Sequence, residues 1–311
     1  MKVLVTGGAG FIGSHLVDAL LGRNDEVVVL DDLSTGKASN LPSHRSLTFV
    51  EGSVTDAGLV AECAQGCDAI AHLAAVVSVQ DSIADPVRSH AVNLTSTVLV
   101  LEAAKRERAR VVFASSAAVY GDNGQAVQKE GEEGVPISPY GIQKLGSEHY
   151  LRVYGQLYDV QGVSFRQFNV YGPRQDPSSP YSGVISIFCC RLLENRPLTV
   201  YGDGLQTRDF IYVRDVVESY LRAFAAPHLS GGPVNIGTGA ATSVLELAHA
   251  VKSAAGSPSS EIGHAPAKAG DIRYSCADIA AFRDSGLAPD GFTGLEAGLQ
   301  ETLAWYADTV C

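Results

Sequence analysis

The sequence predicts an α/β protein, with a doubly wound parallel-sheet domain followed by a smaller α/β lobe. Short apolar runs alternate with helix-like segments along the first 170 residues, which is the pattern of βαβ units. A glycine-rich turn directly follows the first apolar run, and prolines make the pattern less regular from about residue 171. We therefore expect one domain over residues 1–170 and a lobe over residues 171–311, with chain crossings between them.

The elements can be assigned in chain order from apolar periodicity and flanking turn residues. In the first domain we expect strands at Val3–Val5, Val27–Leu30, Leu47–Val50, Ala69–Ala71, Val111–Ala114 and Gly162–Arg166. We expect its helices at Phe11–Leu21, Asp56–Ala64, Val87–Arg106 and Tyr140–Tyr158. In the lobe we expect strands at Leu198–Val200 and Val234–Ile236, and helices at Val213–Ala225, Val244–Ala255 and Leu295–Tyr306.

Composition excludes several functional classes. The chain has 311 residues, 46% of them hydrophobic, which is enough for a sizeable core. A formal net charge of −11 argues against nucleic-acid binding. No apolar run is long enough to span a membrane, and glycines come too early for a signal peptide, so we expect a cytoplasmic protein. The six cysteines form no Cys-x-x-Cys pattern, which favours reduced thiols over a disulfide or a metal site.

The glycine-rich turn Thr6–Gly13 has the spacing of a dinucleotide-binding turn. Gly7, Gly10 and Gly13 are three residues apart, and the turn lies between a strand and a helix. One glycine permits the tight turn, one lets the backbone approach a pyrophosphate, and one lets the helix pack closely. The helix N-terminus then favours the phosphate charge. The first domain is therefore predicted to be a Rossmann domain.

Asp31 ends the second predicted strand, 18 residues after Gly13. A carboxylate at this place accepts hydrogen bonds from both adenosine ribose hydroxyls and repels a 2′-phosphate, so NAD is favoured over NADP. Asp32 adds to that repulsion. The loop that follows also fits an ordinary polar loop, but its residues are candidates for the ribose edge: Ser34, Thr35 and Gly36.

Tyr140 and Lys144 lie four residues apart in the run Ser138–Lys144. On a helix they share a face, and an ammonium beside a phenol stabilises the phenolate. We therefore expect a lowered pKa for Tyr140, which would make it a proton-transfer group near neutral pH. Because this spacing also occurs by chance, its meaning depends on the motifs around it.

Those motifs, taken together, resemble the extended short-chain dehydrogenase/reductase family and, within it, the UDP-hexose 4-epimerases. The resemblance runs nearly end to end. It is carried by Thr6–Gly13, Asp31-Asp32, His72–Ala75, Asn93, Ser115–Gly121, Tyr140–Lys144, Phe168–Arg174, Gly202–Gly204, Arg208–Phe210 and Asn235–Thr238.

The resemblance implies roles at matching positions. Tyr140 would be the catalytic base, Lys144 would bind the nicotinamide ribose, and Ser116 would hydrogen-bond the reacting sugar hydroxyl. Further cofactor contacts are implied at Phe11, Ile12, Ser53, Val54, Leu73, Ala74, Ala75 and Asn93. The family often has Gly-Asp where this chain has Gly52-Ser53, so only a weak contact is expected from Ser53.

The resemblance also implies a binding site for a UDP-sugar in the C-terminal lobe. Asn169 would contact the diphosphate or the sugar, Arg208 would neutralise the diphosphate, and Tyr201 would stack on uracil. Asp271 would bind the uridine ribose, and Lys268 takes the place of a phosphate-binding arginine. Ser275 would face the 2-substituent of the hexose, where a small residue leaves room for an N-acetyl group.

The expected reaction is NAD-dependent 4-epimerisation of UDP-N-acetylglucosamine and UDP-N-acetylgalactosamine, with UDP-glucose and UDP-galactose as a second pair. Ala117-Ala118 stand where 4,6-dehydratases of the family carry acids. A dehydratase is one alternative. A uronate 4-epimerase, using Arg174 or Arg273, is another, and a non-catalytic NAD-sensing protein is a third. The resemblance further implies a homodimer formed through Val87–Arg106 and Tyr140–Tyr158, and a role in polysaccharide biosynthesis.

Overall fold

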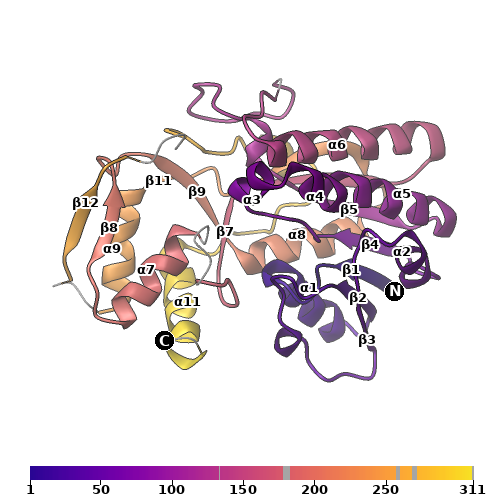
Figure 1. Cartoon of the computed structure of the whole chain (residues 1–311), viewed down its shortest axis with the longest axis horizontal. Coiled ribbons are helices and arrows are strands. Elements are labelled where there is room, and N and C mark those ends of the chain that lie inside the picture. Colours follow the sequence, from indigo (N-terminus) through magenta and orange to yellow (C-terminus); the bar gives the residue numbers. More distant parts are fainter. Residues whose placement is uncertain (133, 178–182, 257–259, 268–271, 310–311) are drawn as a thin grey trace.

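The computed structural model describes the whole chain except residues 133, 178–182, 257–259, 268–271 and 310–311 (Figure 1). Its main sheet is parallel throughout, in the order β10-β6-β5-β4-β1-β2-β3. The strands are β1 (Lys2–Thr6), β2 (Glu26–Asp31), β3 (Leu47–Glu51), β4 (Ala69–His72), β5 (Arg110–Ser116), β6 (Gly162–Gln167) and β10 (Ser230–Ile236). This confirms the predicted doubly wound α/β fold.

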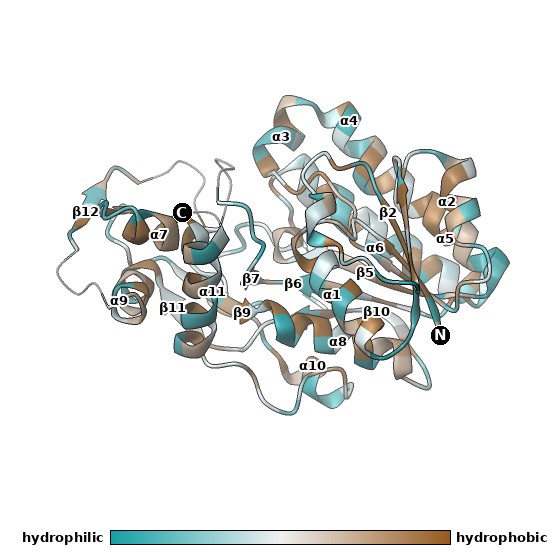
Figure 2. Cartoon of the chain, turned by 90° about the horizontal axis from the view of Figure 1, so that it is seen from below, coloured by the Kyte–Doolittle hydropathy of each residue, from teal (hydrophilic) through white to brown (hydrophobic). Residues whose placement is uncertain are grey.

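Helices cover both faces of this sheet. One face packs against α1 (Phe11–Gly22) and α8 (Val213–Ala225), and the other against α2 (Ala57–Cys63), α5 (Ser96–Glu107) and α6 (Pro139–Tyr158). Strand residues alternate between the two cores: Val112 of β5 belongs to the first, and its neighbours Val111 and Phe113 to the second. Figure 2 shows hydrophobic colour concentrated on the central strands.

The helix predicted at Val87–Arg106 is divided in the structure. It consists of α4 (Pro86–His90), a π-helical turn at Ala91–Thr95 and α5, and a further helix, α3 (Val79–Ala84), precedes it. π-Helical turns widen a helix by one residue and are common at functional sites. Apolar periodicity alone does not reveal such an insertion.

The smaller lobe has two short sheets (Figure 1). One pairs β8 (Leu198–Tyr201) with β12 (Ile262–Ala265), and the other has the order β11-β9-β7. The strands of the second are β7 (Asn169–Tyr171), β9 (Thr207–Tyr212) and β11 (Ala241–Ser243). The lobe's helices are α7 (Val184–Leu193), α9 (Val244–Ala254) and α11 (Leu295–Thr309), and α10 (Ala280–Asp284) packs near β10.

The chain crosses between the two parts more than once. After β7 and β9 it returns to the large sheet through α8 and β10, and β10 then pairs with β6. A single boundary at residue 170 remains a prediction.

Three findings concern the described residues alone. None of their helices is long and apolar enough to cross a membrane. They contain no group of three or more His, Cys, Asp or Glu side chains placed to hold a metal ion. Their cysteines Cys63, Cys67 and Cys276 are not joined in disulfides.

Candidate active site

The glycine turn presents backbone groups to an anion at the start of α1. The helix begins after Gly10 with no side-chain cap and no acidic residue in its first turn, so its first N–H groups and its dipole are available. Gly7 has φ +71°, and a Cβ there would lie 2.8 Å from the Ala74 nitrogen. A Cβ on Gly13 would lie 2.2 Å from the Gly7 carbonyl oxygen. The close packing of these glycines leaves a backbone-lined hollow at the start of α1. Such a hollow fits the pyrophosphate of NAD.

Asp31 lies beside that cradle at the end of β2. It is buried, and its two carboxylate oxygens accept hydrogen bonds from the backbone N–H groups of Ala9 and Leu33, each at 2.9 Å. Burial raises the pKa of Asp31, and these two hydrogen bonds act in the opposite direction. Since each oxygen has a second lone pair, both can still accept from a ribose diol.

The loop after Asp31 folds back on the glycine turn. The Asp32 carboxylate accepts from the Ser34 backbone N–H at 3.0 Å, and the Lys37 N–H donates to the Ala9 carbonyl at 3.0 Å. Thr35 and Gly36 lie within this loop, and a Cβ on Gly36 would meet the Asp31 carboxylate at 3.0 Å. The predicted ribose-contacting residues are therefore held next to the carboxylate that would bind the ribose.

Two other predicted cofactor segments follow β3 and β4. The Ser53 hydroxyl bonds the Thr55 hydroxyl at 2.8 Å, so it is engaged in its own turn, and Val54 is buried in the core. After β4, the Leu73 N–H donates to the Thr6 carbonyl, and the Ala74 N–H donates to the Thr6 hydroxyl at 3.3 Å. Ala75 comes next in the same partly buried stretch. These hydrogen bonds hold the segment after β4 against the glycine turn. The contact of Ser53, Val54 and residues 73–75 with NAD remains a prediction.

Asn93 and His72 are both fully engaged within the protein. The Asn93 side chain accepts from the Val76 N–H at 2.7 Å and donates to the Val76 carbonyl and to the Gln143 side chain. It therefore ties the π-helical turn to α6. Burial and Lys144 lower the pKa of His72 to about 3, so it is neutral, with Thr6 and Thr97 hydroxyls at its ring nitrogens.

The three predicted catalytic residues meet where β5 and α6 come together. Ser116 ends β5, and Tyr140 lies in the first turn of α6, which Ser138 caps through the Gly141 N–H at 3.1 Å. The Tyr140 phenol hydrogen-bonds to Ser116. One turn later, the Lys144 ammonium donates to the Ala114 carbonyl at 2.7 Å.

The pKa of Tyr140 is not shifted in the direction that the sequence predicted. Burial raises it, and the hydrogen bond from Ser116 opposes that rise. The Lys144 nitrogen lies 5.7 Å from the centre of the Tyr140 ring and 4.8 Å from that of Phe113, and it donates a hydrogen bond to the Ala114 carbonyl. Burial also lowers the pKa of Lys144 to about 7. Desolvation of both groups outweighs their attraction, so the expected lowering was wrong for the chain by itself.

A cavity of about 210 Å³ opens beside Ser116. It draws its walls from the ends of β5 and β6, from β7 and β9 and from the segment before α10. The lining residues are Ser116, Ala117, Ala118, Gln167, Phe168, Asn169, Arg208, Ile272 and Ser275. Four predicted sugar-nucleotide residues thus come together, although they are up to 159 positions apart in sequence: Ser116, Asn169, Arg208 and Ser275.

The other substrate predictions have mixed outcomes. The Arg208 guanidinium donates to the Ile272 and Thr207 carbonyls, both at 2.7 Å, which fixes it at the cavity wall. Asn169 pairs with Phe210 across β7 and β9. Tyr201 ends β8 with 40% of its surface exposed and does not line the cavity. Lys268 and Asp271 lie outside the described residues.

Sequence reasoning missed Asp209, which organises the cavity wall. It is fully buried, and its carboxylate accepts from the backbone N–H groups of Thr238, Gly239 and Ala277 at 2.8, 2.9 and 3.2 Å. It thereby holds the segment after Ser275 against β9. The sequence did hold a signal for it, because Asp209 lies between Arg208 and Phe210, in one of the motifs that carry the family resemblance.

Gln167 is a second missed residue. It is the in-register neighbour of Ser116 across β5 and β6, and it lines the cavity. Its amide nitrogen donates to the buried Tyr220 hydroxyl at 3.0 Å. Neighbouring parallel strands end at the same edge of a sheet, so the strand predictions alone place it near Ser116.

The chain is similar to known proteins over nearly its whole length. The model of the NAD dependent epimerase/dehydratase family matches residues 3–237. A UDP-glucose 4-epimerase from Mycolicibacterium smegmatis is 40% identical over 98% of both chains. UDP-N-acetylglucosamine 4-epimerase from Methanobrevibacter ruminantium, solved with UDP-N-acetylmuramic acid, has a TM-score of 0.94 and 36% identity over 99% of both chains. UDP-glucose 4-epimerase from Thermus thermophilus, solved with NAD, has a TM-score of 0.89 and 39% identity over 100% of both chains.

Proposed function

Because the chain belongs to the NAD dependent epimerase/dehydratase family and is an NAD-using UDP-hexose 4-epimerase, we propose that it interconverts UDP-N-acetylglucosamine and UDP-N-acetylgalactosamine. UDP-glucose and UDP-galactose are proposed as a second substrate pair. The observation that carries the proposal is the cavity lined by Ser116, Arg208 and the small side chain of Ser275. Ser116 in turn hydrogen-bonds to Tyr140, which lies behind the cavity wall.

The proposed mechanism assigns one proton to Tyr140. When bound, NAD supplies reversible acceptance of the hydride from C4 of the sugar. Tyr140 removes the proton of the 4-hydroxyl while Ser116 holds that oxygen, which leaves a 4-keto sugar. Arg208 keeps the diphosphate in place while the hexose turns over in the cavity. Tyr140 then returns its proton to the 4-oxygen as the hydride returns to the opposite face of the sugar.

Incubation with separate UDP-sugars tests this proposal. The protein is given UDP-N-acetylglucosamine, UDP-glucose or UDP-glucuronate, and the products are resolved by chromatography and NMR. We expect conversion of the first at its C4 centre, with no loss of water and no release of carbon dioxide. If UDP-N-acetylglucosamine is not converted, the proposed substrate class is wrong.

Ser275→Tyr is expected to remove the N-acetyl activity first. The side chain at 275 lines the cavity, and a phenol there would fill the space proposed for the N-acetyl group. We expect kcat/KM for UDP-N-acetylglucosamine to fall by about 100-fold and that for UDP-glucose to change by less than about threefold. Ser275→Ala is the control and should keep both activities. Equal losses on both sugars in Ser275→Tyr would refute the role in size selection.

Two alternatives are disfavoured by particular residues. A 4,6-dehydratase needs acids beside the reacting serine, and Ala117 and Ala118 line the cavity instead. A uronate epimerase would need a cation for the carboxylate. Arg174 is 2.7 Å from the Asp18 carboxylate, and Arg273 forms two hydrogen bonds to Asp203 at 2.8 and 3.0 Å. A non-catalytic NAD sensor would not require the Ser116–Tyr140–Lys144 arrangement.

We also propose a homodimer formed through the segment Val87–Arg106 and through α6, in a cytoplasmic enzyme that supplies amino-sugar donors for polysaccharide biosynthesis. The support for the dimer is apolar exposure along the helix. The exposed side chains of α6 include Ile142, Tyr150, Val153, Leu157 and Tyr158, with exposed fractions of 37–67%.

Leu157→Lys is therefore expected to weaken the dimer. Leu157 is 67% exposed on α6, and a charge buried in an interface without a partner costs several kcal/mol. Light scattering coupled to size-exclusion chromatography should show a shift from dimer to monomer. Val127→Lys, at an exposed valine in the loop before α6, should leave the mass unchanged. A monomeric wild-type protein would rule out this interface.

A further inference from the structure

Helix α6 is joined to the end of β5 at three successive turns. Tyr140 meets Ser116, Lys144 donates to the Ala114 carbonyl at 2.7 Å, and Glu148 accepts from the Ser115 hydroxyl at 2.5 Å. Residues four apart lie on one helix face. Each of the last three residues of β5, at positions 114–116, therefore contacts one residue of that face. The proposed mechanism uses only the first of these contacts.

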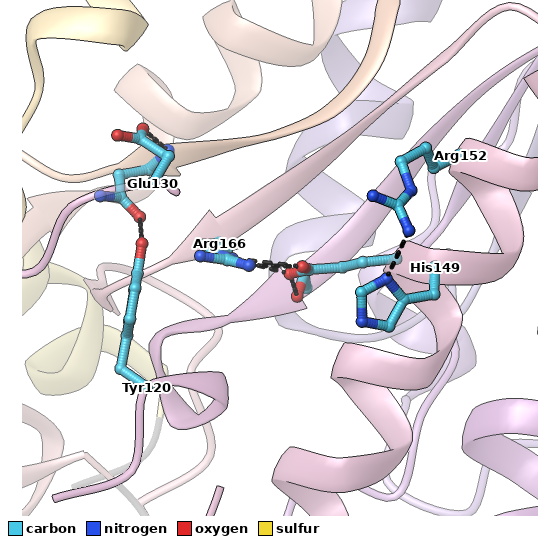
Figure 3. A network of polar contacts seen from close by, with 8 residues as sticks. Tyr120, Glu130, His149, Arg152 and Arg166 are labelled. Atoms are coloured by element: carbon cyan, nitrogen blue, oxygen red, sulfur yellow. Dashed lines mark hydrogen bonds and ion pairs between the residues drawn. The ribbon is translucent and has the colours of Figure 1, made fainter. Parts of the chain in front are cut away.

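The buried Glu148 carboxylate also has a charged partner on a neighbouring strand. Arg166 of β6 binds it through Nε and Nη2 at 3.0 and 2.7 Å, and both side chains are 5% exposed. The Arg166 guanidinium stacks on the Tyr120 ring, 4.7 Å from its centre, and the Tyr120 hydroxyl donates to the Asn235 amide oxygen at 2.6 Å. Figure 3 shows Arg166 between Tyr120 and the acceptor carboxylate on α6. The carboxylate is therefore held by two strands, β5 through Ser115 and β6 through Arg166.

The groups that surround Lys144 also point to Glu148. From its own helix it faces Tyr140 and Glu148, from β4 the neutral His72, and from β5 the Phe113 ring and the Ala114 carbonyl. Arg166 of β6 lies beyond Glu148 and is paired with it.

Charged groups on the other helices packed against α6 lie in the solvent or pair elsewhere. The charged side chains of α3 and α4 are exposed, and Glu102 of α5 binds Lys105 and Tyr154. Burial lowers the pKa of Lys144 to about 7, and Glu148 is the group that raises it.

We propose that Glu148 is a positioning residue that locks the Tyr140–Lys144 face of α6 onto the end of β5 and keeps Lys144 as the ammonium. This rests on the proposed function, since the pair must do proton chemistry for the charge of Lys144 to matter. Lys144 carries its proton below its pKa and loses it as pH rises through that value. Without Glu148, the ammonium is lost at lower pH, and activity that depends on it declines at lower pH.

Glu148→Gln tests this on the full-length protein with bound NAD. The alkaline limb of the pH profile of kcat/KM is expected to move to lower pH by on the order of one unit, with activity at pH 8 about tenfold lower. Ser115→Ala removes one contact and keeps the charge, so its alkaline limb should stay in place. An unchanged limb in Glu148→Gln overturns the proposal.

A double variant distinguishes a purely structural role of Glu148 from its proposed effect on the charge of Lys144. Glu148→Gln leaves Arg166 buried without its partner, which destabilises the fold, whereas Glu148→Gln/Arg166→Met removes both charges. We expect the double variant to regain wild-type melting behaviour and to keep the shifted limb. If it regains the wild-type pH profile as well, Glu148 serves only to hold the fold, and the proposal is overturned.

A second readout does not depend on turnover. NMR of protein carrying ¹⁵N-labelled lysine, with the Lys144 signal assigned by its loss in Lys144→Met, follows the ionisation of Lys144 directly. We expect it to titrate at lower pH in Glu148→Gln. The same titration in both proteins overturns this inference, whereas failure to convert any UDP-hexose overturns the proposed function and leaves this measurement intact.

Discussion

Tyr140→Phe is expected to lower kcat for UDP-hexose epimerisation by about 1,000-fold, because it removes the only group proposed to carry the 4-hydroxyl proton. Tyr140 is 9% exposed and hydrogen-bonded to Ser116, so bulk water has little access to take over its proton transfer. The ring remains, so packing and NAD binding should persist. Initial rates with UDP-N-acetylglucosamine give kcat, and the nucleotide released on denaturation gives the amount of bound NAD.

Tyr150→Phe provides the matched control on the same helix. Tyr150 is 44% exposed and lies ten positions after Tyr140 on α6, so loss of its hydroxyl should leave kcat unchanged within about twofold. A Tyr140→Phe enzyme that keeps more than a tenth of wild-type activity would show that another group moves the proton. A loss of bound NAD in that variant would instead mean that the phenol supports the cofactor.

The sheet was predictable because buried parallel strands are continuous apolar runs. Val27–Leu30 and Val111–Ala114 both read as strands and both lie in the seven-stranded sheet. The strands β7 and β9 were missed, because β7 has only three residues and both strands carry polar residues that line the cavity, Asn169 and Arg208. Polar residues that line a binding site interrupt the apolar run from which a buried strand is predicted.

The catalytic pair was predictable from spacing, since four residues on a helix fix a shared face. Its ionisation was not, because a pKa depends on burial, and the burial of Lys144 arises from strands distant in sequence. Asp209 shows the same limit: its backbone partners at 238, 239 and 277 come together only in the folded lobe. Motifs identify residue types, and tertiary packing decides their charge and partners.

Gly13→Ala is expected to weaken NAD binding by roughly 100-fold, equivalent to about 2.8 kcal/mol. The added Cβ would lie 2.2 Å from the Gly7 carbonyl oxygen and 2.8 Å from the Gly8 Cα. Both contacts are with backbone, so no side chain can rotate away. Helix α1 must move off the turn, and its first N–H groups, which no side chain caps, move away from the pyrophosphate site.

Gly22→Ala separates this steric effect from helix propensity. Gly22 ends the same helix, and a Cβ there would meet nothing within 4 Å. Alanine is favoured over glycine in helices by up to about 1 kcal/mol, so Gly22→Ala should keep or raise the melting temperature. Calorimetric titration of NAD into each apo-protein measures the affinity. Wild-type affinity in Gly13→Ala would mean that the close approach of α1 to the turn does not shape the pyrophosphate site.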